Sequence, residues 1–399
     1  MRDDTTTRRK LLTVTGAAGA AALAGCGGGG GGGSGSSSGN DSGSDDSSGY
    51  GGESLNVLTW AGYGGVAEML EQQTGATVNV KLISSDVEGF NTLNAGGVNQ
   101  FDVMVLDNTW AKRNARADTI RPVQEGDYPS RENWMSQFSW PYDTFVNEGQ
   151  MYAAPPRWGW GGLGYDDRSV DLSTLEERGY AAAWDGSFDG EITLLDWPTW
   201  TIPLVIMQLF DLDGQNPMDI ELSDSRLQQV EDTLVKMFDS AVAVHGGAAG
   251  VRQDMLQGNA TLVMGTGNFG LSQLRAEGND WMKLMYPSDI GGWYWTEGLT
   301  LVNNPDLNRD LAVEFHNQAL TPEGQYSICW EDAESKGAPV NTAAFDEFSE
   351  EEQKTIMMYK DQGFEAAEHL LEDLVQYKIS PQQDEWLDMW SRAKANSSL

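Results

Sequence analysis

Histidine and cysteine are scarce in this sequence. Its 399 residues include three histidines, His245, His316 and His369, and two cysteines, Cys26 and Cys329. Zinc-type metal sites and histidine-dependent triads need imidazole or thiolate groups at set spacings, and these residues lie far apart. We therefore expect no metal, no cofactor and no enzymatic activity. Cys329 stands among apolar neighbours at helical spacing, which predicts a buried structural thiol.

Positive charge is also scarce. The chain has 25 lysines and arginines, only 10 of them lysine, against 60 aspartates and glutamates, so the formal charge is −35. A surface of this sign repels phosphate backbones, which excludes nucleic-acid binding. Because the acids are spread along the whole chain, they predict a solvated surface adapted to high salt rather than a cation store.

No apolar run is long enough to span a bilayer, and the one near the start has only 15 residues, 11–25. It follows the pair Arg8-Arg9 and ends in Leu23-Ala24-Gly25-Cys26, which resembles the lipobox of exported lipoproteins. We expect residues 1–25 to be a twin-arginine signal peptide and Cys26 to be the lipidated N-terminus; a core cysteine is the alternative. Residues 26–52, almost all Gly, Ser, Asp and Asn, predict a flexible tether.

From about residue 53, short apolar strands alternate with amphipathic helices. We expect strands at 55–59, 77–83, 101–107, 192–195, 261–264 and 299–302, and helices at 66–73 and 226–240. Thr321-Pro322 and the capping box that begins at Ser349 mark two further helix starts. This alternation predicts an α/β fold.

Tryptophan is plentiful, with 15 residues. Many stand beside glycine or in expected loops after strands: Trp60, Trp110, Trp158, Trp160, Trp197, Trp200, Trp293 and Trp295. Others are placed like ordinary packing residues: Trp134, Trp140, Trp184, Trp386 and Trp390. In open α/β sheets, ligands bind beyond the carboxyl ends of the strands, so the first set predicts a binding site rich in indole.

A series of short motifs runs through residues 53–345. It comprises Trp60-Ala61-Gly62-Tyr63, Asp102 through Trp110, Pro155-Pro156-Arg157-Trp158-Gly159, Tyr286 through Gly292, Trp295-Thr296-Glu297-Gly298-Leu299 and Gly337-Ala338-Pro339-Val340-Asn341. In this order the series resembles the substrate-binding proteins of ABC importers, specifically their spermidine/putrescine-binding branch. The resemblance implies a type II periplasmic-binding-protein-like fold, in which two α/β lobes enclose a ligand cleft and close about a hinge. Lobe 1 would hold residues 53–156 and 297–342, and lobe 2 residues 157–296 and 343–399.

The resemblance also assigns site residues. Carried over position by position, it makes Trp60, Tyr63, Trp110 and Trp295 aromatic faces and Glu297 an acid that holds an ammonium group. The remaining candidates for ligand contact are Asn108, Trp158, Asp196, Trp197 and Trp200.

The sequence departs from the family pattern in its acids. Gly62 stands where the family has an acid beside the first-loop tyrosine. Trp197 and Trp200 stand at an acidic pair, which leaves Asp196 as the nearby acid. Fewer acids and more indoles favour a monoamine, a short diamine or a quaternary ammonium compound over a long polyamine.

Together these observations predict an extracellular solute-binding lipoprotein. It would capture a small organic cation, a polyamine or related amine, and deliver it to the permease and ATPase subunits of an ABC importer. We expect a monomer at the extracellular face of the cytoplasmic membrane, attached through the lipid anchor alone. A sugar-binding importer component is one alternative, because sugars also stack on indoles. A secreted polysaccharide hydrolase is another, and it would need two carboxylates on either side of a bond.

Overall fold

The computed structural model describes residues 49–399, which fold around a twelve-stranded mixed sheet and carry a separate two-stranded sheet. The predicted signal peptide, Cys26 and the tether up to residue 48 lie outside the described residues. The strands are β1 (Ser54–Thr59), β2 (Thr77–Leu82), β3 (Val103–Asp107), β4 (Ile120–Arg121), β5 (Val146–Asn147), β6 (Gln150–Met151), β7 (Arg157–Asp166), β8 (Ile192–Leu195), β9 (Ala241–His245), β10 (Leu262–Gly267), β11 (Met282–Met285), β12 (Gly292–Val302), β13 (Ala338–Pro339) and β14 (Leu374–Gln376).

The helices alternate with the strands, as the sequence predicts. They are α1 (Gly64–Thr74), α2 (Asp86–Asn94), α3 (Asn108–Arg116), α4 (Leu172–Arg178), α5 (Pro198–Leu209), α6 (Asp224–Ser240), α7 (Ala248–Gln257), α8 (Asn268–Ala276), α9 (Arg309–Ala319), α10 (Pro322–Tyr326), α11 (Glu350–Met357), α12 (Ala367–Glu372) and α13 (Gln383–Asn396). Within residues 49–399, no helix combines the length and the apolar character that crossing a bilayer requires.

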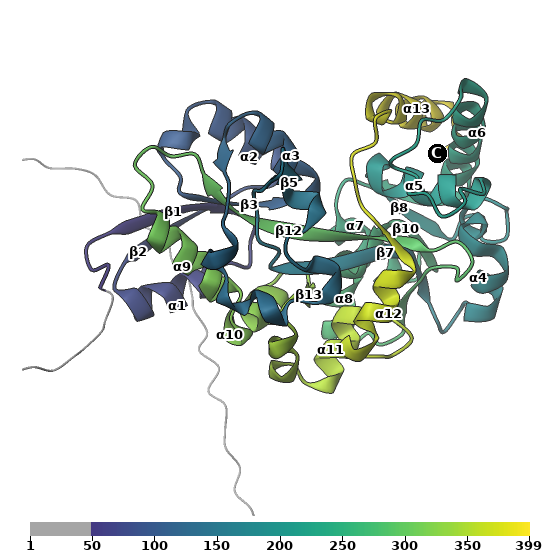
Figure 1. Ribbon diagram of the computed structural model, residues 1–399. Helices are drawn as coiled ribbons and strands as arrows, with labels where there is room; N and C mark the ends of the chain where they lie inside the picture. The colour runs from purple at the N-terminus through teal and green to yellow at the C-terminus, as the bar shows by residue number, and fades with distance from the viewer. Residues whose placement is uncertain (1–48) are drawn as a thin grey trace, which may run out of the picture. The chain divides into compact units, whose positions relative to one another are not determined.

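The first lobe is built on the parallel strands β2, β1 and β3. Helix α1 packs against α9, and α2 and α3 pack against β3, as Figure 1 shows. Because the carboxyl ends of parallel strands meet at one edge of a sheet, the loops after β1, β2 and β3 come together there.

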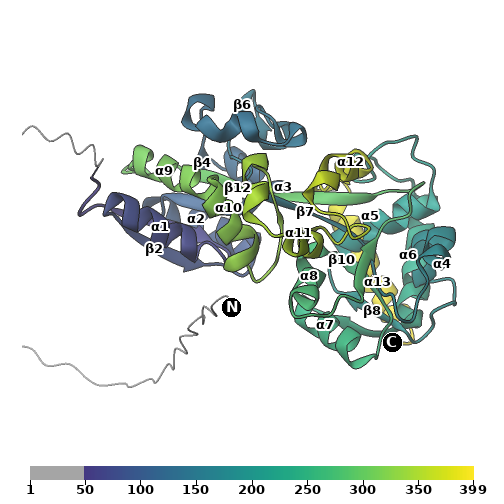
Figure 2. The ribbon, with the colours of Figure 1, turned by 90° about the horizontal axis from the view of Figure 1, so that it is seen from below.

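The second lobe repeats this arrangement with the parallel strands β10, β8 and β9. Strand β7 pairs antiparallel with β10 and β11 and extends the sheet. Helices α5, α6 and α13 pack together, and α8 packs against α7 and α11 (Figure 2). The loops after β8 and β10 meet at the carboxyl edge of this second sheet region.

Strand β12 joins the two lobes. Its residues Trp293–Thr296 pair with β7, whereas Glu297–Leu301 pair with β3. All of its residues are buried, as are those of β7. In Figures 1 and 2 both strands run between the two groups of helices. Strand β12 therefore exchanges β7 for β3 as its partner between Thr296 and Glu297.

The predicted elements form, and both helix starts are confirmed. The Thr321 hydroxyl caps α10, and Ser349 with Glu352 forms the capping box of α11. Cys329 is buried, as expected.

The loop assignment of several tryptophans was wrong. Trp158 and Trp160 lie within β7, and Trp293 and Trp295 lie within β12. Trp110 lies in α3 and Trp200 in α5. The glycines beside the tryptophans of β7 and β12 indicate close packing between these two strands rather than turns.

Candidate functional site

Two aspartates occupy the carboxyl edge of the first lobe. Asp86 is the first residue of α2, which follows β2, and Asp107 is the last residue of β3 and caps α3. The Asp107 backbone N–H donates a hydrogen bond of 3.0 Å to Asp86 Oδ1. The Thr109 N–H and hydroxyl donate to Asp107 Oδ1. Each carboxylate keeps its second oxygen without a protein partner among residues 49–399, and neither forms an ion pair there.

The two carboxylates repel each other, and both are crowded by protein atoms although each residue keeps some exposed surface. Burial raises the pKa of Asp107 from 3.8 to about 6, against the opposing effect of the Thr109 hydrogen bonds, and nearby Glu297 adds to the rise. Burial and the charge of Asp107 raise the pKa of Asp86 well above its usual range. A bound cation would relieve both effects, because opposite charge favours the ionised form.

Glu297, the predicted ligand acid, already has a partner. Arg157 donates to both of its carboxylate oxygens, from Nη2 at 2.7 Å and from Nε at 2.9 Å. The Tyr63 hydroxyl donates to Oε2 at 2.7 Å. Arg157 Nη1 also donates to the carbonyl oxygens of Ile328 and Ser335. This buried bidentate pair ties the first residue of β7 to β12 and neutralises Glu297.

Six aromatic side chains gather on the second-lobe side. This aromatic cluster consists of Trp197, Trp200, Phe269, Trp293, Trp295 and Tyr377. Trp197 stacks on Phe269 at 5.7 Å, and Trp200 meets the edge of Trp293 at 4.4 Å. Phe269 contacts Trp295 edge-on at 6.3 Å. Trp197 and Trp200 are only half-buried, so they present accessible indole surface.

Glycines in β7 make room for the cluster. Gly161 lies opposite Trp293 and Gly159 opposite Trp295 in the antiparallel pairing. A β-carbon at Gly161 would stand 2.1 Å from the Trp293 ring, and one at Gly159 would stand 2.6 Å from the Trp295 ring. Only glycine at these two positions lets both indoles lie against the β7 backbone.

Asn108 and Tyr377 connect the acids to the aromatic cluster. The Asn108 amide donates to the Tyr377 carbonyl at 2.7 Å, and Asn108 Oδ1 accepts from the Thr296 N–H. The Tyr377 ring packs on Trp200, while its hydroxyl donates to Thr199 at 2.8 Å. Burial and the negative charge of Asp107 and Asp86 raise the pKa of Tyr377, so its hydroxyl stays protonated.

The structure therefore brings together six of the predicted residues: Tyr63, Asn108, Trp197, Trp200, Trp295 and Glu297. Trp60 follows β1 at the same edge and is half-buried.

Three other candidates are engaged elsewhere. One face of Trp110 is covered by the Arg113 guanidinium at 4.6 Å. Trp158 has no exposed surface and packs on Phe138. Asp196 accepts from Trp390 and pairs with Lys394 at 2.8 Å, both on α13.

Sequence reasoning missed Asp86, Asp107, Arg157, Phe269 and Tyr377. The rule that drew attention to tryptophans at strand ends applies equally to Asp86 and Asp107, which directly follow or end predicted strands. Tyr377 carries no such signal, because only the fold brings the segment around β14 beside Asn108.

Comparisons with known proteins place this geometry in a fold. No family model matches the sequence, and no curated protein matches it. The spermidine/putrescine ABC transporter substrate-binding protein PotD of Streptococcus pneumoniae superposes with a TM-score of 0.69 at 17% identity, over 86% of this chain and 99% of its own. The Tp0655 (TpPotD) lipoprotein of Treponema pallidum gives 0.66 at 16% identity, over 86% of this chain and 100% of its own. The GacH receptor of Streptomyces glaucescens, solved unliganded and with acarbose, gives 0.65 at 14% identity, over 87% and 94%.

The chain thus has the two-lobe, periplasmic-binding-protein-like α/β fold, with a cleft between the lobes. This confirms the predicted fold class and the structural resemblance to spermidine/putrescine-binding proteins. The neighbours are transport proteins that take different ligands, because one is named for spermidine/putrescine and another was solved with acarbose. The ligand of this chain must therefore be argued from its own residues.

Proposed function

We propose that this protein captures a small organic cation outside the cell and delivers it, chemically unchanged, to the permease of an ABC importer. The observation that carries the proposal is the pair Asp86 and Asp107. Both acids lie at helix starts, they contact each other, and they have no cationic partner among the described residues. Two unpaired carboxylates in a desolvated place favour a ligand that brings positive charge.

The aromatic cluster supplies the second half of recognition. Each contact between an ammonium group and an indole face contributes about 0.5–2 kcal/mol, the upper value where water is excluded. Trp197 and Trp200 offer such faces, and Trp60 lies on the opposite lobe. Direct charge pairing, which the sequence assigned to Glu297, falls to Asp86 and Asp107 in this proposal. Glu297 and Arg157 then fix the junction of the lobes.

The arrangement also indicates how large the ligand is. Two neighbouring acids suit one compact cationic group, or the near end of a short diamine. A long polyamine would need a second acid at the far end of the site. Asp196, the candidate for that role, is paired with Lys394. We therefore infer a monoamine, a short diamine or a quaternary ammonium compound.

We further propose that the lobes divide at residues 156/157, 296/297 and 342/343 and close over the ligand. The binding protein would act as a monomer that passes its cargo to the permease and its ATPase subunits. Twin-arginine export and lipidation of Cys26 would hold it at the extracellular face of the cytoplasmic membrane. Replacing Cys26 by Ser should release the protein into the medium or leave it uncleaved. Unchanged size and membrane attachment of that variant would contradict the anchor.

A sugar is the competing ligand, because it stacks on indoles without needing charge. Native mass spectrometry of the protein purified from its own host identifies what it carries. A copurified amine would support the proposal, and loss of that amine from an Asp86→Asn/Asp107→Asn variant would link it to the acids. A copurified neutral sugar that survives in the same variant would refute it.

A further inference from the structure

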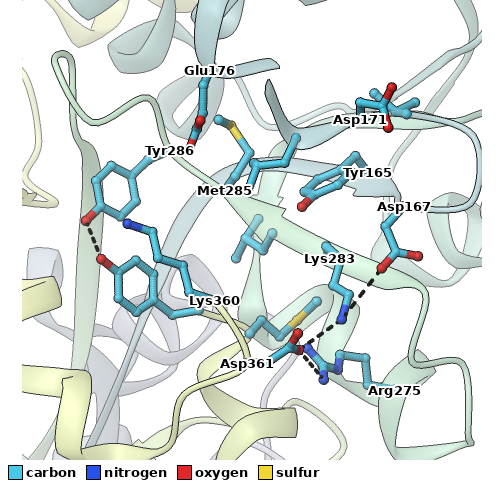
Figure 3. Close-up of a pocket in the computed structure, with 15 residues that line it drawn as sticks. Tyr165, Asp167, Asp171, Glu176, Arg275, Lys283, Met285, Tyr286, Lys360 and Asp361 are labelled. Atoms are coloured by element: carbon cyan, nitrogen blue, oxygen red, sulfur yellow. Dashed lines mark hydrogen bonds and ion pairs between the residues drawn. The ribbon is translucent and has the colours of Figure 1, made fainter. Parts of the chain in front are cut away.

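A separate cavity of about 420 Å³ lies in the second lobe. Its walls come from the end of β7, the start of α4, the end of α8, strand β11 and the turn after α11 (Figure 3). No residue of the aromatic cluster lines it, and Trp160 lies beside it, with its ring against the edges of Tyr286 and Tyr359. This volume is in the range of small-molecule sites.

The deep part of this cavity carries positive charge. Arg275 and Lys283 line it with side chains only 6% and 18% exposed. The acids that face them, Asp361 and Asp167, are 60% and 40% exposed. The Asp361 carboxylate lies 2.9 Å from Lys283 Nζ and makes a longer contact of 3.4 Å with Arg275 Nη2. The other two guanidinium nitrogens of Arg275, Nε and Nη1, have no hydrogen-bond partner among residues 49–399. Buried cations are therefore only partly neutralised by well-hydrated acids.

Asp361 is held there by an unfavourable turn. The Gln362 N–H donates to the Tyr359 carbonyl at 2.8 Å across Lys360 and Asp361, whose φ angles are 48° and 53°. Two left-handed central residues define a type I′ turn, where Asn and Gly are preferred. A lysine and an aspartate are disfavoured there, because the left-handed conformation brings the β-carbon close to the following carbonyl oxygen. The turn places the Asp361 carboxylate beside Arg275 and Lys283, as Figure 3 shows, and orients Lys360 along the cavity wall.

The remaining walls are aromatic and apolar. The rings of Tyr286 and Tyr359 stack at 5.9 Å, and Tyr165 lines another side. Burial raises the pKa of the Tyr165 hydroxyl to about 12, so it remains a hydrogen-bond donor. The exposed acids Asp171 and Glu176 also line the cavity. The volume is far larger than a halide ion needs, and the walls suit a ligand with an apolar body.

From this geometry we propose a second binding site, which takes a small organic carboxylate in the cavity lined by Arg275, Lys283 and Lys360. The ligand carboxylate contacts the buried cations that Asp361 partly neutralises, and its apolar body packs on Tyr165, Tyr286 and Tyr359. The Asp361 carboxylate competes with the ligand carboxylate for Arg275 and Lys283. The site is distinct in position from the one proposed to bind the cation, and its buried part carries the opposite charge.

Calorimetric titration of the full chain with sodium benzoate, at fixed ionic strength, tests the proposal. Benzoate should saturate one site, and Lys360→Gln should weaken its binding about fivefold because one cation is lost. Asp361→Asn should strengthen binding about threefold or more, because the competitor is gone. Both residues are exposed, so these variants should fold. Lys236→Gln, which removes an exposed lysine on helix α6 of the same lobe, is the matched control and should change nothing.

Two further titrations test which charge and which size of ligand the cavity accepts. Benzylamine has the same ring with the opposite charge and should not bind this cavity; binding that Lys360→Gln strengthens would overturn the proposal. Sodium bromide tests whether a halide alone is taken. Bromide binding without benzoate binding would overturn it, as would benzoate binding that neither Lys360→Gln nor Asp361→Asn alters.

Discussion

In the proposed site, Asp107 serves ligand binding at the expense of the empty protein. Its carboxylate is desolvated beside Asp86, and a cation relieves that strain. Replacing Asp107 by Asn should therefore weaken binding of a small organic cation at least about tenfold, which corresponds to about 1.4 kcal/mol. The same variant should stabilise the ligand-free protein by about 1–2 kcal/mol at pH 7. Titration calorimetry and thermal unfolding measure the two effects.

The control is Asp143→Asn, which removes an exposed acid of the same lobe. It carries the same change in net charge and should alter neither quantity. Equal effects of the two variants would show that overall charge, and not the paired site, attracts the ligand.

The pH dependence of Asp107 has opposite signs for folding and for binding. Burial raises its pKa from 3.8 to about 6, so between pH 4 and 6 the folded protein holds a proton that the unfolded chain has released. This contribution to stability is present below pH 4 and is lost as pH rises through 6. Cation affinity should instead fall as pH drops below 6, because the acid becomes neutral. The free energy of unfolding and the cation affinity should both be measured for wild type and Asp107→Asn between pH 4 and 6. If the differences between the two proteins do not depend on pH, the raised pKa of Asp107 is contradicted.

Glu297 illustrates a residue whose position is predictable and whose role is not. Glu297→Gln leaves the buried Arg157 without its counter-charge and should destabilise the fold by about 3–5 kcal/mol. The double variant Arg157→Met/Glu297→Met removes both charges and should recover most of this loss. Urea unfolding of the three proteins provides the test. A single variant as stable as wild type would show that the ion pair does not hold the junction.

At the scale of elements, the glycines of β7 determine where the indoles of β12 lie. Gly159→Ala puts a methyl group against the Trp295 ring, so Trp295 must shift. We expect a loss of about 1–3 kcal/mol in stability, as overpacking gives, together with weaker ligand binding. Gly126→Ala is the control, since a β-carbon there meets nothing within 4 Å. Unchanged stability and affinity of Gly159→Ala would rule out this packing.

The sequence predicts the regular strands well and the junction poorly. Strands β3 and β8 are short, mostly apolar runs, and β1 and β2 mix apolar with polar residues over six positions, so their pattern is local. Residues 157–164 and 292–298 mix glycine with tryptophan, and their strand character depends on pairing between segments far apart in the chain. Because the pattern of β1 is local, the positions of Trp60 and Tyr63 just after this strand can be predicted from the sequence. The pairing of Glu297 with Arg157, and of Asp196 with Lys394, depends on contacts that no local pattern specifies.

At the scale of the whole molecule, the formal charge of −35 sets the conditions for folding. Like charges over the surface repel one another unless counter-ions screen them within a Debye length of about 3 Å at 1 M salt and about 30 Å at 0.01 M. We expect the melting temperature to fall steadily as salt is diluted from molar to millimolar concentration. A melting temperature that does not depend on salt would contradict adaptation to brine.

In the proposed function, the site recognises positive charge on the ligand. Choline and its neutral isostere 3,3-dimethyl-1-butanol have nearly the same shape, so titrating both into wild type and into Asp86→Asn/Asp107→Asn isolates charge. Putrescine and maltose extend the comparison to a diamine and a sugar. We expect wild type to bind choline or putrescine and to reject the isostere and maltose, and we expect amine binding to be lost when both acids become amides. Tight binding of maltose or of the neutral isostere that persists in the double variant would contradict it.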